Sequence, residues 1–282
     1  MCLIGSGASP GIANMLAVVA GRELDTVDRL ITGWNIAAAH PEQSHSGGVS
    51  AAMVHVMEQI SGTIPVTRGG QLVHRPALEK VTFDYPGLGT FHTRSIGHPE
   101  AVTLRRAFPE LRDNVNVCVG DKFTMATLSS LRRLIDKGAL TLDRAGAALD
   151  RLFGLLPTSP TDFLKPGSPP PLFAVATGTR QGRPGSAATA LAQVPGFSMA
   201  AATGVPLAVT ALLMKASRRP GTHPMETLID PDAFFAALAP HCFGDPSPKH
   251  MTATTTSWAP DERNRQAFGT SLLTALLHAG RA

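Results

Sequence analysis

Glycine and proline interrupt this chain at short intervals, and this spacing limits the fold more than any other feature. The 282 residues include 27 glycines and 23 prolines, together well above the ~12% of average usage. Both residues break long regular elements. The sequence therefore predicts many short elements joined by long connections, and it argues against a plain helical bundle.

Composition excludes several classes of protein. Apolar residues make up 43% of the chain and charged residues 16%, which is typical of a globular protein and not of a disordered one. The formal net charge is +4, but basic residues stand singly or in pairs and aromatic residues are few. No basic block stands beside stacking aromatic residues, so we expect no nucleic-acid partner.

Neither a metal site nor a membrane segment is predicted. The three cysteines lie far apart without a CxxC pair, which argues against structural zinc and a dense disulfide framework and favours a reducing compartment. The histidines include no HExxH, and His40 and His45 are only a weak pair. The first 20 residues are apolar, but breakers interrupt them and no basic stretch precedes them. We expect a cytoplasmic protein.

Hydrophobic spacing predicts a mixture of helices and strands. Strands are expected at 2–4, 27–36, 81–85 and 115–119, and 172–179 and 186–194 form a hairpin with a longer loop at 180–185. Helices are expected at 12–21, closed by Gly21, and at 49–60, 128–134, 141–152, 199–214, 231–238 and 261–278. Residues 157–171 form a linker, and 244–260 show little pattern.

The order of these elements predicts an α+β fold, with a mixed, largely antiparallel sheet and helices packed on it. In one strand, Val115, Val117 and Val119 alternate with Asn114, Asn116 and Cys118. This alternation predicts a half-buried strand whose second face is polar and exposed.

Residues Gly5–Gly11 lie between a strand and a helix, where dinucleotide-binding folds place glycines that admit a pyrophosphate. The spacing here is GxGxxxG, and Pro10 removes one backbone donor. The strand at 27–36 is followed by Ala37–Ala39, with no acidic residue for a ribose. A tight turn that starts a helix is the simpler interpretation, and the loop could also border a ligand held by other segments.

A second motif resembles the nucleophile elbow of hydrolases. Ser198 lies in Gly-Phe-Ser-Met-Ala between a predicted strand and a predicted helix, and Asp230 and His250 follow in a suitable order. Ala200 replaces the last glycine of the motif, and Pro195 sits at the turn. A helix N-cap is the alternative role for Ser198.

Two further segments combine residues that packing alone does not require. The sequence Gly97-His98-Pro99-Glu100 could direct polar groups at a pocket, or it could be an ordinary turn. In the helix at 199–214, Gly204 beside Thr203 permits close approach of a ligand or another backbone, or it introduces a kink.

Taken together, the ordered segments resemble the C-terminal part of the saccharopine dehydrogenase-like oxidoreductases. The matching segments are Gly7–Asn14 with its PGxxN core, Gly33–Ile36, Gly47–Gly48, Ser61–Val66, Gly97–Leu104, Ala202–Ala208 and Asp230–Phe235. The resemblance covers residues 1–242 and leaves 243–282 as a tail, partly disordered with a possible terminal helix.

The resemblance implies a substrate-side domain that completes the active site of an NAD(P)-dependent enzyme whose Rossmann domain lies outside this chain. Most of the cofactor site is then absent. Pro10, Gly11 and Asn14 are expected to line the cofactor–substrate cleft, with His98, Glu100, Thr203 and Gly204 as further candidates. No arginine lies between Trp34 and Gly62, where saccharopine dehydrogenases are expected to carry one.

Three functions remain open at this point. The first is a partial oxidoreductase, inactive without a Rossmann domain, with a small-molecule substrate, a homodimeric state and a separate Rossmann-domain chain as partner. The second is a non-catalytic binding or dimerisation module. The third is a serine hydrolase that uses Ser198.

Overall fold

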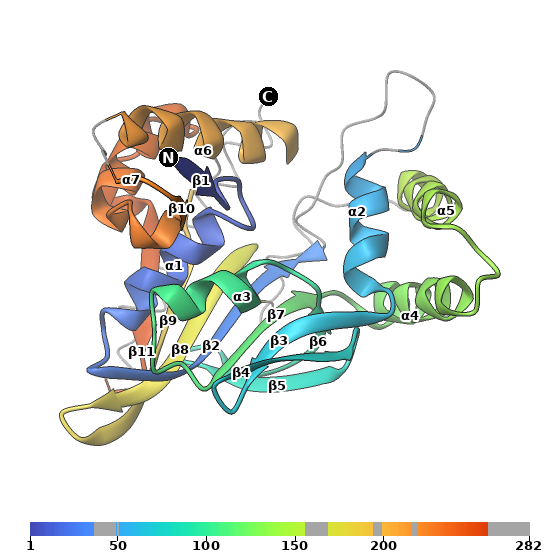
Figure 1. Ribbon diagram of the computed structural model, residues 1–282, viewed down its shortest axis with the longest axis horizontal. Coiled ribbons are helices and arrows are strands. Elements are labelled where there is room, and N and C mark those ends of the chain that lie inside the picture. Colours follow the sequence, from blue (N-terminus) through green and yellow to red (C-terminus); the bar gives the residue numbers. More distant parts are fainter. Residues whose placement is uncertain (37–48, 50, 156–168, 194–198, 216–218, 259–282) are drawn as a thin grey trace.

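The computed structural model describes residues 1–36, 49, 51–155, 169–193, 199–215 and 219–258 (Figure 1). The strands are β1 (Cys2–Ile4), β2 (Thr26–Asn35), β3 (Thr63–Arg68), β4 (Gln71–Pro76), β5 (Lys80–Tyr85), β6 (Gly89–Ile96), β7 (Asp113–Val119), β8 (Leu172–Arg180), β9 (Arg183–Leu191), β10 (Thr222–Pro224) and β11 (Thr252–Thr256). The α-helices are α1 (Ile12–Gly21), α2 (Ala51–Ile60), α3 (Glu100–Thr103), α4 (Lys122–Asp136), α5 (Leu142–Leu155), α6 (Met199–Met214) and α7 (Pro231–Leu238). Short 3-10 turns are η2 (Leu104–Arg106), η4 (Met225–Thr227), η5 (Ala239–His241) and η6 (Pro248–His250).

One nine-stranded sheet organises the molecule. Its strand order is β11-β9-β8-β2-β7-β3-β4, and the β5–β6 hairpin joins the sheet through β6 and β7. Strands β2 and β7 are parallel, and the other pairs in this sheet are antiparallel. Strands β1 and β10 form a separate parallel pair. The predicted α+β fold with a mixed, largely antiparallel sheet is confirmed.

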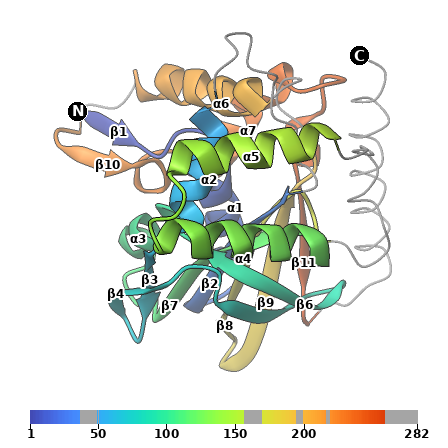
Figure 2. The same cartoon turned by 90° about the vertical axis from the view of Figure 1, so that its right-hand side faces the viewer.

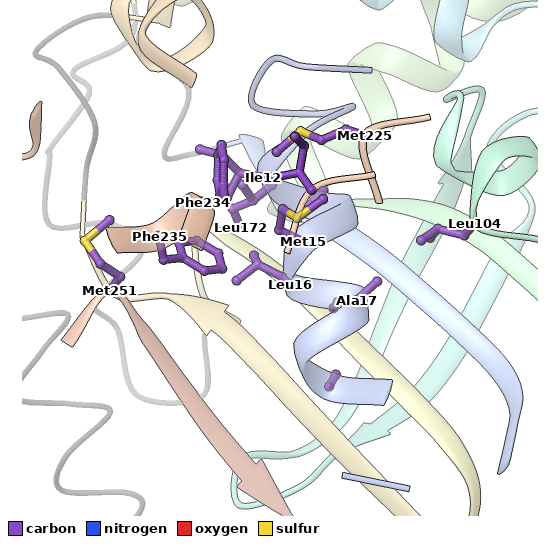
Figure 3. Close-up of a cluster of buried hydrophobic side chains, with 14 of the residues drawn as sticks. Ile12, Met15, Leu16, Ala17, Leu104, Leu172, Met225, Phe234, Phe235 and Met251 are labelled. Atoms are coloured by element: carbon purple, nitrogen blue, oxygen red, sulfur yellow. The ribbon is translucent and has the colours of Figure 1, made fainter. Parts of the chain in front are cut away.

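Helices cover one face of the central strands in two groups. Helix α1 packs on β8 and β9, and Figure 3 shows its side chains gathered with Phe234 and Phe235 of α7. Helices α2, α4 and α5 form the second group (Figure 2), which buries Met57, Leu128 and Leu149. The opposite face of the sheet packs against side chains of the β5–β6 hairpin. The short helix α3 lies over β7 and β3.

Several local predictions are confirmed. In β5 the buried side chains are Val81, Phe83 and Tyr85, and they alternate with exposed ones. Helix α7 begins as predicted, because the Asp230 carboxylate accepts a hydrogen bond from the Ala233 amide at 3.2 Å and Pro231 occupies the first turn. Both features follow from side-chain chemistry that acts within a few residues.

The prediction of an exposed polar face on β7 is wrong. Asn114, Asn116 and Cys118 are as buried as the valines that alternate with them. Alternation showed correctly that the strand has two different faces, but it carries no information about what covers each face. Here α3 covers the asparagines, and their amides bind its backbone.

The predicted hairpin has a shorter loop than expected. Strands β8 and β9 pair as far as Arg180 and Arg183, which leaves a two-residue turn of Gln181 and Gly182. Both turn residues have positive φ, at 50° and 70°. Such a turn matches the twist of the flanking strands, so pairing extends through Pro184 on β9.

Two further expectations change. Gly21 belongs to α1 and does not cap it with a positive φ; a Cβ at this position would overlap the ring of Phe108. Residues 252–256, which show little pattern, form β11 and pair with β9 at the edge of the sheet. Among the described residues, no helix is long and apolar enough to cross a membrane.

Candidate functional site

The loop Gly5–Gly11 makes a sharp turn into α1, and its backbone amides form hydrogen bonds within the loop and the start of the helix. The Gly7 amide donates to the Pro10 carbonyl at 2.7 Å, and the Ile12 amide donates back to the Gly7 carbonyl at 3.0 Å. Gly11 has φ 140°, and a Cβ there would overlap the Gly7 carbonyl. Its amide donates to the Asn14 side-chain oxygen at 2.9 Å. The loop therefore has a fixed shape, with a cis peptide bond between Ser9 and Pro10.

Helix α3 is held against the sheet by side chains of two strands, β7 and β3. The Asn116 side-chain oxygen accepts from the Ala101 amide at 3.0 Å, and the Asn114 side chain donates to the Glu100 carbonyl at 2.7 Å. The Thr67 hydroxyl donates to the Ala101 carbonyl at 2.9 Å. On its other side the Asn116 amide donates to the Thr32 hydroxyl at 2.5 Å. These bonds fix the place where Glu100 enters the protein interior.

The loop and α3 meet in a buried polar cluster, which we call the Ser9–His98–Glu100 cluster. Glu100 is fully buried and His98 is 5% exposed. His98 Nδ1 and Glu100 Oε2 lie 2.6 Å apart. The Ser9 hydroxyl donates to the other oxygen of the Glu100 carboxylate, so both oxygens have partners.

The charge state of Glu100 follows from these contacts. Burial by itself would raise the pKa of Glu100, but the positive charge of protonated His98 and the hydrogen bonds from His98 and Ser9 lower that pKa below its ordinary value. Glu100 also fixes the orientation of the imidazole by binding Nδ1. Nε2 is then the ring nitrogen that Glu100 leaves for another partner. The ring of His55 on α2 lies edge-on to His98, with 6.1 Å between centroids.

A second buried carboxyl lies close to the cluster. Glu226 in η4 is 7% exposed, and neither carboxyl oxygen has a hydrogen bond within the distance and angle limits of ordinary bonds among the described residues. Burial raises the pKa of Glu226; the nearby Thr103 hydroxyl and Asn14 amide lower it in part, and the charge of Glu100 raises it further. Thr103 and Asn14 are themselves joined at 3.1 Å. Two neighbouring carboxyls thus have pKa values moved in opposite directions.

Most of the predicted site residues lie close together, although they differ in exposure. Pro10 and Gly11 belong to the loop that contacts His98 and Glu100 through Ser9. Asn14 is fully buried and uses both side-chain amide atoms inside the protein. A Cβ at Gly7 would lie 3.0 Å from the Thr203 methyl carbon, which brings α6 to the same loop.

Gly204 faces open space, and no described atom lies within 4 Å of a Cβ built on it. Thr203 is exposed beside it. Pro206 lies inside α6, which continues from Met199 to Met214 as one helix. The glycine is therefore not required by packing among the described residues.

A complete dinucleotide site does not fit the described residues. The amides that would face a pyrophosphate, at Gly7, Gly11 and Ile12, are bound within the loop and the first turn of α1. Among the described strands, β1 pairs with β10 alone and does not belong to a parallel sheet of several strands. In the part of the chain that the structure describes, no group of three or more His, Cys, Asp or Glu side chains could hold a metal ion.

The hydrolase hypothesis receives no support from the two other members of its candidate triad. Ser198 lies outside the described residues, as do His40, His45, most of the 157–171 linker and the predicted helix 261–278. Asp230 caps α7 and pairs with Arg22. His250 Nδ1 lies 3.0 Å from the Ser247 hydroxyl in an exposed turn.

Sequence reasoning missed four polar residues that build this site: Ser9, Thr103, Asn116 and Glu226. Ser9 directly precedes Pro10, so its place in the loop was visible but its partner was not. Asn116 was assigned to an exposed face. The hydrogen-bonding residues come from positions as far apart as 9, 32, 100 and 116, and no local signal connects such distances.

Comparison with known proteins gives a distant structural similarity. Neither a protein-family model nor a curated protein sequence matches the chain. Among solved structures, apo histidine-tagged saccharopine dehydrogenase (L-Glu forming) from Saccharomyces cerevisiae is similar, with 14% identity and a TM-score of 0.48 over 82% of this chain and 70% of that chain. A similarity of this extent does not assign the chain to a family.

Proposed function

We propose that this chain is the substrate-side part of an NAD(P)-dependent oxidoreductase of the saccharopine dehydrogenase-like type. One observation supports this above the others. Two segments that carry the sequence resemblance, at 7–14 and 97–104, meet in the Ser9–His98–Glu100 cluster, and the third, at 202–208, lies against the same loop through Thr203 and Gly7. In this proposal the chain is a cytoplasmic homodimer, it takes a small-molecule substrate, and a separate Rossmann-domain chain supplies the nucleotide site.

Within that proposal, His98 transfers a proton to or from the substrate. Glu100 holds the imidazole in a fixed orientation, as a carboxylate partner does for a histidine in general acid–base catalysis. Ser9 binds the second carboxylate oxygen and so keeps the carboxylate in place. NAD(P) would supply the hydride chemistry. We derive no step through it, because the described amides do not form its phosphate site.

The test is a pair of binding measurements. Calorimetry with NADPH should give no binding for this chain alone. Light scattering should show a complex with a separately expressed chain that contains a βαβ unit with GxGxxG, taken from an adjacent reading frame, and that complex should bind NADPH. Micromolar binding of NADPH by this chain alone, or the absence of any such complex, would contradict the proposal.

A second candidate, a non-catalytic dimerisation module, is favoured by the surface of α6. Leu207 and Leu212 on this helix are 55% and 60% exposed, so two large apolar side chains of α6 are turned to solvent. Substitution L207E/L212E should convert a dimer into a monomer in light scattering. The matched control is F123E, which changes an exposed phenylalanine on the distant helix α4. It should leave the mass measured by light scattering unchanged.

A further inference from the structure

A cavity of about 460 Å³ lies beside the end of α1, and three arginines from separate segments line it. Arg22 follows α1, Arg106 ends η2 and Arg219 precedes β10. Glu226 forms part of the wall. The chain therefore brings cations that are distant in sequence to one hollow.

The charge of this cavity is positive. Arg22 is compensated by Asp230 and by Asp232, whose carboxylate lies 3.1 Å from the guanidinium. Within the described part of the chain, the Arg106 guanidinium donates to the Thr222 carbonyl, at 3.3 Å. Among the described residues, neither Arg106 nor Arg219 pairs with a carboxylate.

Glu226 does not cancel this charge. Both of its carboxyl oxygens are buried away from solvent, and the polar groups near them are those of Asn14 and Thr103, inside the protein. The residue lines the cavity, but its carboxyl oxygens have almost no exposed surface. Two guanidinium groups are thus left for an anionic ligand.

The cavity also has an apolar side. The ring of Phe108 lines it, and the same ring lines a second cavity of about 310 Å³ next to Leu24 and Val27, whose far wall also includes Asp25 and Glu110. The two cavities share Gly21, Ala107 and Phe108. An anion held by the arginines could therefore extend an apolar group across Phe108.

We propose that this cavity binds a phosphate monoester, with the phosphate between Arg106 and Arg219 and the organic body along Phe108. Guanidinium groups bind phosphate through paired, charge-assisted hydrogen bonds. A phosphate monoester carries close to two negative charges at neutral pH, which matches the two arginines without carboxylate partners. This site is independent of the proposed oxidoreductase function.

Calorimetry with phenyl phosphate on the full chain tests the site. The substitutions R106Q and R219Q should each weaken binding about tenfold, because each removes hydrogen bonds to a charged group, and the double variant should show no measurable binding. Arg22 is kept, because it also anchors α7 through Asp230. The matched control is R183Q at an exposed position of the β8–β9 hairpin, which should bind as the unmodified chain does.

Two further arms identify the ligand chemistry. Inorganic phosphate should bind about tenfold more weakly than phenyl phosphate, because it buries no apolar surface. Phenyl phosphate should bind more weakly at pH 5 than at pH 7.5, since its second pKa lies near 6. No binding at millimolar concentration, or equal weakening by R183Q, would overturn the site. If inorganic phosphate bound as tightly as phenyl phosphate, the proposed contact between the organic group and Phe108 would be wrong.

Discussion

The two faces of strand β7 are both buried, yet they are stabilised in different ways. On one face, Val115 and Val117 pack against Phe173 in an apolar cluster. On the other, Asn114 and Asn116 bind the backbone of α3 and so support Glu100. Apolar packing tolerates small changes of shape, whereas a buried polar group without its partner is destabilising. The polar face is therefore the part of the sheet that specifies a site.

The largest effect is expected on the apolar face. Phe173 is fully buried, with its ring centroid 5.7 Å from that of Phe83 and 5.8 Å from that of Tyr85. The substitution F173A should lower the free energy of unfolding by about 3–5 kcal/mol, as large cavities in cores do. Urea denaturation measures it. As a control, F123A at a 55% exposed position should change stability by less than about 1 kcal/mol.

On the polar face, N116A should cost about 2–4 kcal/mol, because the buried Ala101 amide and Thr32 hydroxyl each lose a partner. Amide hydrogen exchange should also show faster exchange at Ala101. An unchanged exchange rate at Ala101 would mean that Asn116 does not hold α3.

The pH dependence of the stability of E100Q separates the contribution of the Glu100 charge from that of its packing. A lowered pKa in the folded state stabilises the protein above the unfolded pKa of ~4.3 and loses that effect as pH falls through the folded value. At pH 7 we expect E100Q to be about 2–3 kcal/mol less stable than the unmodified chain. Denaturant titrations between pH 7 and pH 3.5 should show that difference shrinking. A difference that stays constant with pH would assign the effect to packing.

Glu226 should show the opposite sign and the smallest effect. Its raised pKa means that burial destabilises the protein only as pH rises above the unfolded value of ~4.3. The variant E226Q should therefore be about 1–2 kcal/mol more stable than the unmodified chain at pH 8, with no difference at pH 4. The exposed Glu110 provides the control E110Q, which should be neutral at both pH values.

Sequence patterns predicted the elements whose causes are local. The alternation in β5 and the Asp230 cap of α7 depend on residues a few positions apart, and both are present. The β8–β9 hairpin was predicted, but its turn was expected to be longer, because Gln181 is not a typical residue for positive φ. Strand β11 was missed because Thr252–Thr256 shows no alternation, and it exists through its pairing with β9.

The sequence singled out several residues that lie close together in the structure, but not the hydrogen bonds that connect them. His98 and Glu100 stood out because their chemistry is unusual for a turn. Their partner Ser9 lies about ninety positions away, and the hydrogen bond between them depends on how α1 and α3 pack. Glu226 gave no signal at all, since a single glutamate between Met225 and Thr227 looks like any exposed acid.

The place of β2 in the sheet has a consequence for how the chain folds. This strand is made within the first 35 residues, but its neighbours are β7 at residues 113–119 and β8 at residues 172–180. During synthesis both edges of β2 stay without these partner strands until β7 and β8 have been made. Contacts of such high sequence separation slow folding, and unpaired strand edges invite pairing with other chains. We therefore expect incomplete chains to aggregate most readily, and to depend most on chaperones, before residue 180 has left the ribosome.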